Sequence, residues 1–308
     1  MKALLQQVSA ERLRRHLFHL SSDPIRFRKV NYTAPGSDKP SLDEADEFIR
    51  AELEKAGLSV TTTQYRAQAF RCDETKPVHH WYSAPMPGDP WYDIHNLEVE
   101  IPGRECPEEI IQLVSHKDSM SWIDSPGAGD NAVGTVANME LARVLAAHPL
   151  ERTVRVLFCN EEHTPWTSQY TAEAAAERGD KIIAVLNQDS LTGKSDEDRR
   201  AGRQVHAACY STDEGNPLAE FIKATNRRHE IGLDVTVVDK GCINDDDGMF
   251  INAGYRTAVT NIGTCPYADA EYHLPGDCPE RVDMENLLSS TRLVLATVLD
   301  LSKAGTPW

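Results

Sequence analysis

Apolar residues recur along this chain with two periods, and these periods predict where helices and strands lie. Residues 41–57 place their apolar side chains on one helical stripe, which ends at Gly57. Ser41 and Glu44 have the spacing of a capping box, so this helix is predicted to begin at Ser41. Residues 1–20 show the same helical spacing among Gln, Glu and Arg and predict an amphipathic surface helix.

The rest of the chain alternates strand-like with helix-like segments, which predicts an α/β fold. We expect a mixed, mostly parallel central sheet with helices on both faces. Further helices are predicted at residues 132–148, 168–176 and 284–303, and one more has Asn216 as its cap and Pro217 in its first turn. The predicted strands are residues 58–70, 96–101, 109–115, 153–158, 182–186, 204–211, 234–239 and 255–262.

Two segments with neither period predict exposed loops. The Pro-rich stretch between residues 77 and 90 contains His79 and His80, which have no partners at metal-ligand spacing and are expected to be solvated. Residues 195–200, SDEDRR, predict a solvated loop of mixed charge.

The domain organisation is expected to be simple. The chain has 308 residues and contains no linker of low complexity and no internal repeat, so one domain, residues 1–308, is predicted. In this domain, residues 1–95 supply N-terminal helices, a strand and a loop that pack on a core of residues 96–308.

Composition narrows the range of partners and compartments. The net charge of −16, from 48 acidic against 32 Lys and Arg residues, repels phosphate backbones and anionic lipid, so neither nucleic acid nor membrane is an expected partner. No long apolar run and no secretion-type leader is visible, which favours a cytoplasmic location. Seven cysteines, an odd number without CxxC spacing, favour a reducing compartment and argue against thiol-ligated zinc.

Side chains with metal-ligand chemistry stand just beyond several predicted strands. One such residue alone carries little weight, because an acidic pair after a strand usually means that the strand has reached the surface. In an α/β sheet, however, the carboxyl ends of neighbouring strands meet at one edge, so residues in these positions are expected to converge. The candidates, in chain order, are His116, Asp118, Asp130, Glu161, Glu162, Asp189 and His273.

In this order, the segments around the candidates resemble the dizinc aminopeptidases of the bacterial leucyl aminopeptidase and aminopeptidase Y type. The likeness covers the chain from about residue 96 to the end, whereas residues 1–95 match only loosely. It is carried by HKDS (116–119), PGAGDNAVG (126–134), NEE (160–162), Asp189, DDDGMFINAGY (245–255) and YHLPGD (272–277).

The resemblance implies two divalent metal ions per chain, expected to be Zn²⁺, and an activity that removes the N-terminal residue from a peptide or aminoacyl substrate. Zinc accepts imidazole and carboxylate ligands, and a bridging carboxylate suits a two-metal site. Glu161 would be the general base, Asp118 would hold His116, and the Tyr272 hydroxyl would donate to the developing oxyanion. The implied metal ligands are His116, Asp130, Glu162, Asp189 and His273, with Asp130 bridging the ions.

The chain departs from the family pattern at several positions. Gly129 precedes Asp130 where an Asp is common, and Asp247 stands where a His is common. Gln188 and Ser190 flank Asp189 where an apolar neighbour is frequent, and Thr164-Pro165-Trp166 replaces a turn that usually contains Gly and Leu. These changes leave the preferred N-terminal residue open. The oligomeric state is also open.

Three alternatives are weighed against the aminopeptidase. Carboxypeptidase or aminoacylase relatives insert a lid domain before the final His, but the segment from Asp189 to His273 must already supply three strands and a helix of the main sheet. A single-zinc glutaminyl cyclase relative would lack the first His, which this chain keeps as His116. A metal-free binding module on the same fold would lose ligands. The run from Asp245 to Asp247 either lines the mouth of the site, where it meets a substrate amine, or forms a solvated loop.

Overall fold

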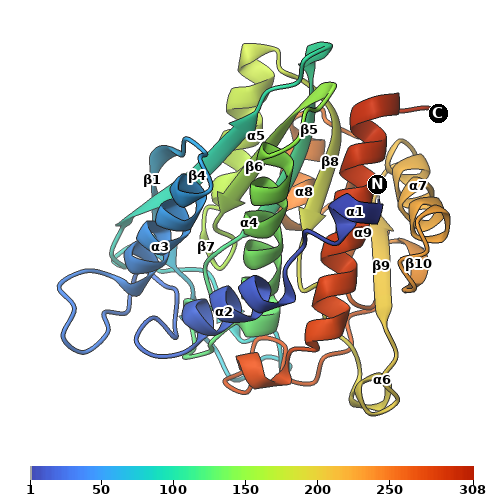
Figure 1. The fold of residues 1–308 in the computed structure, drawn as a ribbon. Helices are drawn as coiled ribbons and strands as arrows, with labels where there is room; N and C mark the ends of the chain where they lie inside the picture. Colours follow the sequence, from blue (N-terminus) through green and yellow to red (C-terminus); the bar gives the residue numbers. More distant parts are fainter. Residues whose placement is uncertain (1) are drawn as a thin grey trace.

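The computed structural model describes residues 2–308, in which a mixed sheet of nine strands forms the centre (Figure 1). The strand order is β10-β9-β11-β8-β5-β6-β4-β1-β7. Strands β11, β8, β5 and β6 are parallel neighbours, and antiparallel strands flank them on both sides. The bounds are β1 Thr61–Ala69, β4 Tyr92–Ile101, β5 Cys106–His116, β6 Arg152–Cys159, β7 His163–Thr164, β8 Lys181–Gln188, β9 Val205–Tyr210, β10 Asp234–Asp239 and β11 Ala258–Ile262.

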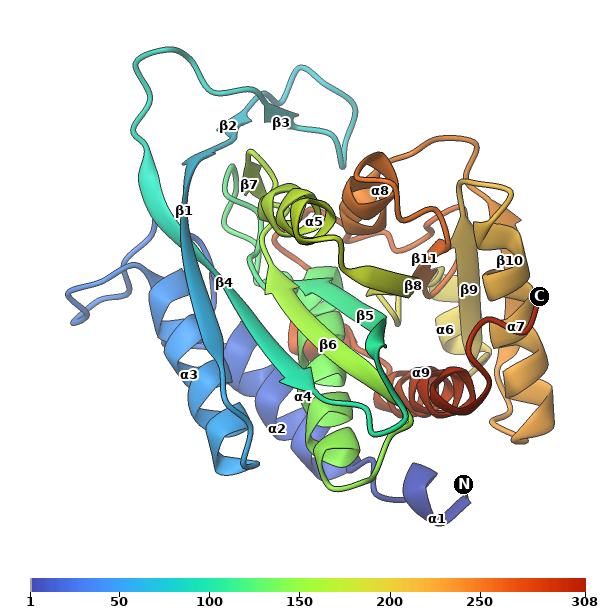
Figure 2. The same cartoon turned by 90° about the horizontal axis from the view of Figure 1, so that it is seen from above.

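Helices cover both faces of this sheet. Figure 2 shows α2, α3, α4 and α9 on one face and α5 and α8 on the other. The buried stripes of α2, α4 and α9 join the strands in one large apolar core. The bounds are α1 Lys2–Leu5, α2 Ala10–Ser21, α3 Ser41–Lys55, α4 Val133–Ala146, α5 Thr167–Arg178, α6 Asp196–Arg200, α7 Gly215–Arg228, α8 Asp245–Asn252 and α9 Met284–Ala304.

The predicted fold class is confirmed. Between Asp189 and His273 the chain forms β9, β10 and β11 of the main sheet together with α6, α7 and α8. This segment is therefore fully used by the central α/β layer, and an inserted lid domain does not occur within residues 2–308.

The predicted start of α3 was right but its capping box was wrong. Pro40 is the N-cap residue and provides no side-chain cap. Ser41 is fully buried, and its hydroxyl donates instead to the carbonyl of Phe27. Glu44 accepts a hydrogen bond from the Ser37 hydroxyl at 2.5 Å. Both side chains therefore bond to the loop that packs on the helix, and neither caps the first turn of α3.

Local capping corrects three further predictions. Ser9 caps α2 by accepting from the amide of Arg12 at 3.2 Å, so residues 1–20 contain two helices rather than one. Residues 195–200 form α6 rather than a loop, because Ser195 caps a turn that is acidic at its start and basic at its end. Asn216 is not a cap, since α7 already begins at Gly215.

Arg28 ties the N-terminal segment to the loops at the strand ends, and nothing in the sequence predicted it. Its side chain is fully buried and donates to the carbonyls of Lys117 at 2.8 Å, Pro126 at 2.7 Å and Gly127 at 2.7 Å, as well as to that of Leu20. Burial lowers the pKa of Arg28 to about 10, so the group stays charged at neutral pH.

We expect Arg28→Met to lower the free energy of unfolding by about 3–5 kcal/mol, because several buried carbonyls would lose their donor. Urea denaturation followed by circular dichroism would measure the change. Arg26→Met, at an exposed position two residues away, is the matched control and should change stability by less than about 0.5 kcal/mol. Equal stability of both variants would contradict this reading of Arg28.

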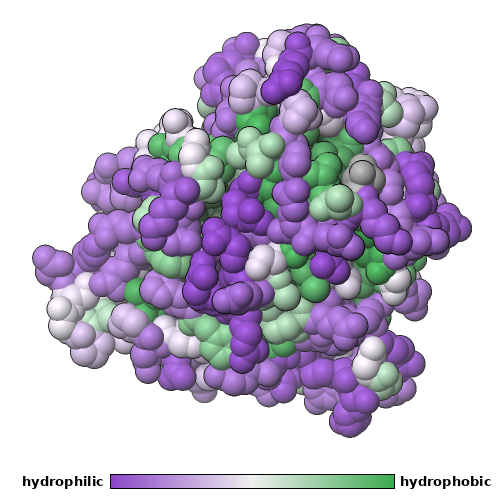
Figure 3. Space-filling view, in the orientation of Figure 1, coloured by the Kyte–Doolittle hydropathy of each residue, from purple (hydrophilic) through white to green (hydrophobic). Residues whose placement is uncertain are grey.

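The surface is largely polar. Figure 3 shows a mostly hydrophilic face with small scattered hydrophobic areas. Among residues 2–308, every helix is too short or too polar to cross a bilayer. All seven cysteines carry free thiols.

Candidate metal centre

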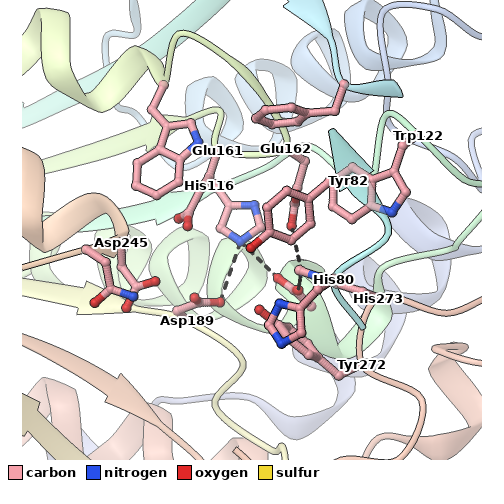
Figure 4. Close-up of a pocket in the computed structure, with 14 residues that line it drawn as sticks. His80, Tyr82, His116, Trp122, Glu161, Glu162, Asp189, Asp245, Tyr272 and His273 are labelled. Carbon is pink, nitrogen blue, oxygen red and sulfur yellow. Dashed lines mark ion pairs between the residues drawn. The ribbon is translucent and has the colours of Figure 1, made fainter. Parts of the chain in front are cut away.

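The five predicted metal ligands converge at one edge of the sheet. His116 is the last residue of β5, Glu162 follows β6 and Asp189 follows β8. Asp130 lies in the turn Ala128–Ala132 before α4, where the backbone leaves helical geometry at Asp130 and Asn131, and His273 lies in the loop between β11 and α9. All five line one cavity of about 200 Å³, and Figure 4 labels four of them, His116, Glu162, Asp189 and His273. The other residues that line it are Phe70, His80, Tyr82, Trp122, Glu161, Trp166, Asn244, Asp245 and Tyr272.

The ligand atoms form two adjacent groups that share Asp130. His116 Nε2 lies 3.0 Å from Asp130 Oδ1 and 3.5 Å from Asp189 Oδ1. His273 Nε2 lies 3.1 Å from Asp130 Oδ2 and 3.4 Å from Glu162 Oε1. Each oxygen of Asp130 therefore faces a different imidazole, as a bridging carboxylate does in a two-metal site.

The carboxylates around His116 and His273 favour positive charge at this site. Burial alone would lower the pKa of His273, but the carboxylates of Glu162 and Asp130 outweigh burial and raise the pKa to about 10. The pKa of His116 is also raised, against burial, by Asp118, Asp130 and Asp189. Burial raises the pKa of Glu162 to about 7. Without metal ions, the two imidazoles and Glu162 hold protons that partly neutralise the clustered carboxylates. Divalent cations would provide the same compensation, so these donors fit metal ions.

Two sets of three residues each bring their ligand atoms close enough to hold one metal ion. The sets share His116, and one of them includes Glu161. His116, Asp130 and Glu162 offer ligand atoms within 4.8 Å of one another, and so do His116, Glu161 and Asp189. Among residues 2–308, the buried Oε2 of Glu161 has no hydrogen-bond partner. Burial and the carboxylates of Asp246 and Asp245 raise the pKa of Glu161 well above its ordinary value. A carboxyl group with these properties is suited to exchange a proton next to the metal ligands.

Asp118 organises the strand ends around His116. It accepts from His116 Nδ1 at 3.3 Å and from the backbone amides of Glu161 at 3.0 Å and Glu162 at 2.9 Å. His163 Nδ1 donates to the same carboxylate at 2.7 Å, and its Nε2 accepts from a backbone amide. Asp118 therefore fixes the orientation of one imidazole and the turn that carries both glutamates. His163 was missed because its partner is 45 residues away.

Asp277 performs a similar role for Asp130. Its carboxylate accepts from the backbone amides of Gly129 at 2.7 Å and Asp130 at 3.0 Å. A Cβ atom on Gly129 would meet Asp277 Oδ1 at 2.9 Å, which explains why glycine fits at this departure from the family pattern. The sequence contained Asp277 in the YHLPGD segment but gave it no role.

The prediction that His79 and His80 are solvated was wrong for His79, which is partly buried and hydrogen-bonded, whereas His80 is exposed as predicted. The carbonyl of His79 accepts from His273 Nδ1 at 2.7 Å, and His79 Nδ1 donates to the carbonyl of Tyr272. His80 and Tyr82 line the cavity. We call residues 70–92, which carry the short strands β2 Arg71–Cys72 and β3 Tyr82–Ser83, the covering loop. The hydrogen-bond partners of His79 lie almost 200 residues further along the chain, so the local sequence could not reveal them.

Aromatic packing and backbone strain also concentrate here. The ring of Tyr272 stacks on that of His273 with centroids 3.7 Å apart. Four non-glycine residues around the cavity have a left-handed backbone, with φ of 74° at His79, 45° at Ser190, 61° at Asp245 and 58° at His273. Such conformations cost about 1–3 kcal/mol each and persist where surrounding contacts impose them, which is common at functional sites.

Comparisons with other sequences show related proteins of fungi. The chain is 24% identical to a probable zinc metalloprotease of Pyrenophora teres f. teres, over 99% of this chain and 69% of that protein. It is 25% identical to leucine aminopeptidase 1 of Leptosphaeria maculans, over 98% of this chain and 73% of that protein.

Solved structures share the fold at lower identity. A leucine aminopeptidase precursor from Bacteroides thetaiotaomicron superposes with a TM-score of 0.73 at 16% identity, covering 95% of this chain and 97% of the other. The glutaminyl cyclase of the same organism gives 0.72 at 15%, covering 95% and 98%. One fold thus carries two chemistries. The sequence model of Peptidase family M28 matches residues 96–298, about two thirds of the chain. The chain therefore belongs to peptidase family M28.

Proposed function

We propose that this protein is a zinc-dependent aminopeptidase that hydrolyses the bond after the N-terminal residue of a peptide. The observation that carries the proposal is the position of Asp130, whose two oxygens lie 3.0 Å and 3.1 Å from the imidazoles of His116 and His273. The names of the related zinc metalloprotease and leucine aminopeptidase support this reading.

The residues present would hold two ions. His116, Asp130 and Asp189 would bind one, and Asp130, Glu162 and His273 the other, with imidazole and carboxylate donors that suit zinc. Such a pair of ions supplies an acidified water and polarises the scissile carbonyl.

The protein's own residues move the proton and orient the ligands. Glu161 accepts a proton from the attacking water at Oε2, which has no partner among residues 2–308, and passes it to the leaving amine. Asp118 and the carbonyl of His79 hold Nδ1 of the two imidazoles, so that Nε2 of each faces Asp130. The Tyr272 hydroxyl donates to the developing oxyanion from the wall of the cavity.

The glutaminyl cyclase fold makes a single-metal acyltransferase the main alternative. His116 argues against it, because the residue is buried, directed at Asp130 and Asp189, and supported by Asp118. Metal analysis after zinc loading separates the possibilities: two ions per chain support the aminopeptidase, one supports the cyclase, and none supports a binding module.

The function is tested with a panel of aminoacyl-anilides. We expect the zinc-loaded protein to cleave anilides with a free α-amino group at least about 100-fold faster, in kcat/KM, than the N-acetylated forms, because acetylation removes the cationic group that marks a substrate terminus. Release of the aniline chromophore measures both rates. Equal rates on both forms would indicate an endopeptidase or amidase instead.

A further inference from the structure

A second cavity of about 180 Å³ adjoins the metal-centre cavity. Asp189, Asn244, Asp245 and Tyr272 line both cavities, so the two lie side by side at these residues. The remaining wall combines hydroxyl, thiol and ammonium groups with a larger share of apolar surface. It consists of Ser190, Cys209, Lys240, Thr260, Ile262, Thr264, Cys265 and Tyr267.

Lys240, Asp245 and Asp247 form a charged triad where the two cavities meet. Lys240 Nζ donates to Asp245 Oδ2 at 3.0 Å, to Asp247 Oδ1 at 3.0 Å and to Thr260 Oγ1 at 3.1 Å. These three acceptors use the three N–H groups of the ammonium, so Lys240 has no donor left for a substrate carboxylate. One lysine faces two aspartates, and the triad therefore carries one uncompensated negative charge.

That charge is presented to the cavity by Asp245. Asp247 is fully buried and also accepts from the Thr260 hydroxyl at 2.7 Å, whereas the Asp245 side chain keeps 23% of its surface exposed. Within residues 2–308, the hydrogen bonds of the Asp245 side chain run through Oδ2 alone, which leaves Oδ1 available. Figure 4 shows Asp245 beside Asp189 at the edge of the cavity.

The backbone and the environment both indicate that Asp245 is held in place for a ligand. It adopts φ of 61° at the first residue of α8, a conformation that is costly for a non-glycine residue. Burial raises the pKa of Asp245, and Lys240 opposes this only in part. A cationic ligand at Oδ1 would offset the desolvation of the carboxylate.

We propose that Asp245, positioned by Lys240, binds the free α-ammonium group of the substrate, and that the adjoining cavity receives the first side chain. The inference rests on the proposed aminopeptidase function and identifies the group that would restrict it to chain termini. The α-ammonium is the cation nearest the scissile carbonyl, and Asp245 lines the cavity that holds the metal ligands. Lys240 acts on the ammonium group through Asp245 and is a positioning residue.

Two hydroxamates that differ only in the amine test this assignment. Leucine hydroxamate and its des-amino analogue, 4-methylpentanohydroxamate, are titrated calorimetrically into the zinc-loaded protein. We expect the amine to tighten binding by about 10- to 100-fold in the natural sequence, as a charge-assisted hydrogen bond does. In Asp245→Asn the ratio of the two dissociation constants should fall below about 3. Asp234→Asn, an exposed change on β10, should keep the full ratio.

The outcomes separate a binding role from a structural one. If Asp245→Asn weakens both hydroxamates equally, or keeps the full ratio at unchanged metal content, the assignment is overturned. Lys240→Met should reduce the ratio in part while leaving the affinity for the des-amino compound within about 3-fold, and an unchanged ratio would remove Lys240 from the proposal. Absence of hydrolysis for every anilide would overturn the proposed function itself, whereas hydrolysis with an unchanged ratio would overturn the role of Asp245 alone.

Discussion

Glu161→Gln is expected to lower kcat about 10²- to 10⁴-fold, the range in which general acid–base catalysis contributes. The amide keeps the size of the side chain but cannot accept the proton that the carboxylate takes from the attacking water. The backbone amide of Glu161 would still donate to Asp118 at 3.0 Å, so the turn and the metal ligands should remain in place. Steady-state kinetics, metal analysis and thermal unfolding together measure the effect.

The matched control is Glu173→Gln on the exposed face of α5, which removes the same charge far from the cavity and should leave kcat within about 2-fold. Near-normal turnover by the Glu161 variant would remove this residue as the base. Loss of metal from the variant would instead identify Glu161 as a ligand, in agreement with its cluster with His116 and Asp189.

Asp130→Ala is expected to abolish the binding of both metal ions at micromolar zinc and to lower kcat/KM by more than about 10⁴-fold. The reason is that Asp130 offers one oxygen to each imidazole group, whereas Asp189 and Glu162 each belong to a single group. Asp189→Ala should therefore lose one ion and keep the other. Mass spectrometry of the desalted proteins gives the stoichiometry directly.

Asp213→Ala, at an exposed position, controls for the loss of a carboxylate and should keep two ions. Retention of two ions by Asp130→Ala would contradict a bridging role. Loss of both ions from Asp189→Ala would show that the two groups do not bind independently, and the bridging assignment would then need a crystallographic test.

The convergence of the ligands could be predicted from sequence because it follows from the order of apolar segments. Each run that forms β5, β6 or β8 is buried, and the residue just past it must lie at the sheet edge. His116, Glu162 and Asp189 are therefore brought together by topology alone. Asp130 and His273 occupy loops, so they were candidates only through their places before a helix and after a strand, and the resemblance to a known family supplied their roles as ligands.

The supports of these ligands could not be predicted, because they act through long-range contacts or through the backbone. Arg28 reaches carbonyl groups that carry no side-chain signature. The contribution of His79 to His273 is a peptide oxygen, which any residue type would provide. Asp277 acts on two amides almost 150 positions away. Similarly, Ser41 follows the pattern of a cap, but the loop packed against it supplied a better acceptor.

The covering loop would affect how tightly the proposed ions are bound. Its His79 carbonyl is the acceptor for His273 Nδ1, while its His80 and Tyr82 form part of the cavity wall. A bulky substrate that displaces this segment would release the imidazole from its acceptor. In the proposed two-ion site, access for large peptides would compete with retention of the ion at His273, and zinc loss during turnover is expected to be fastest with the longest substrates.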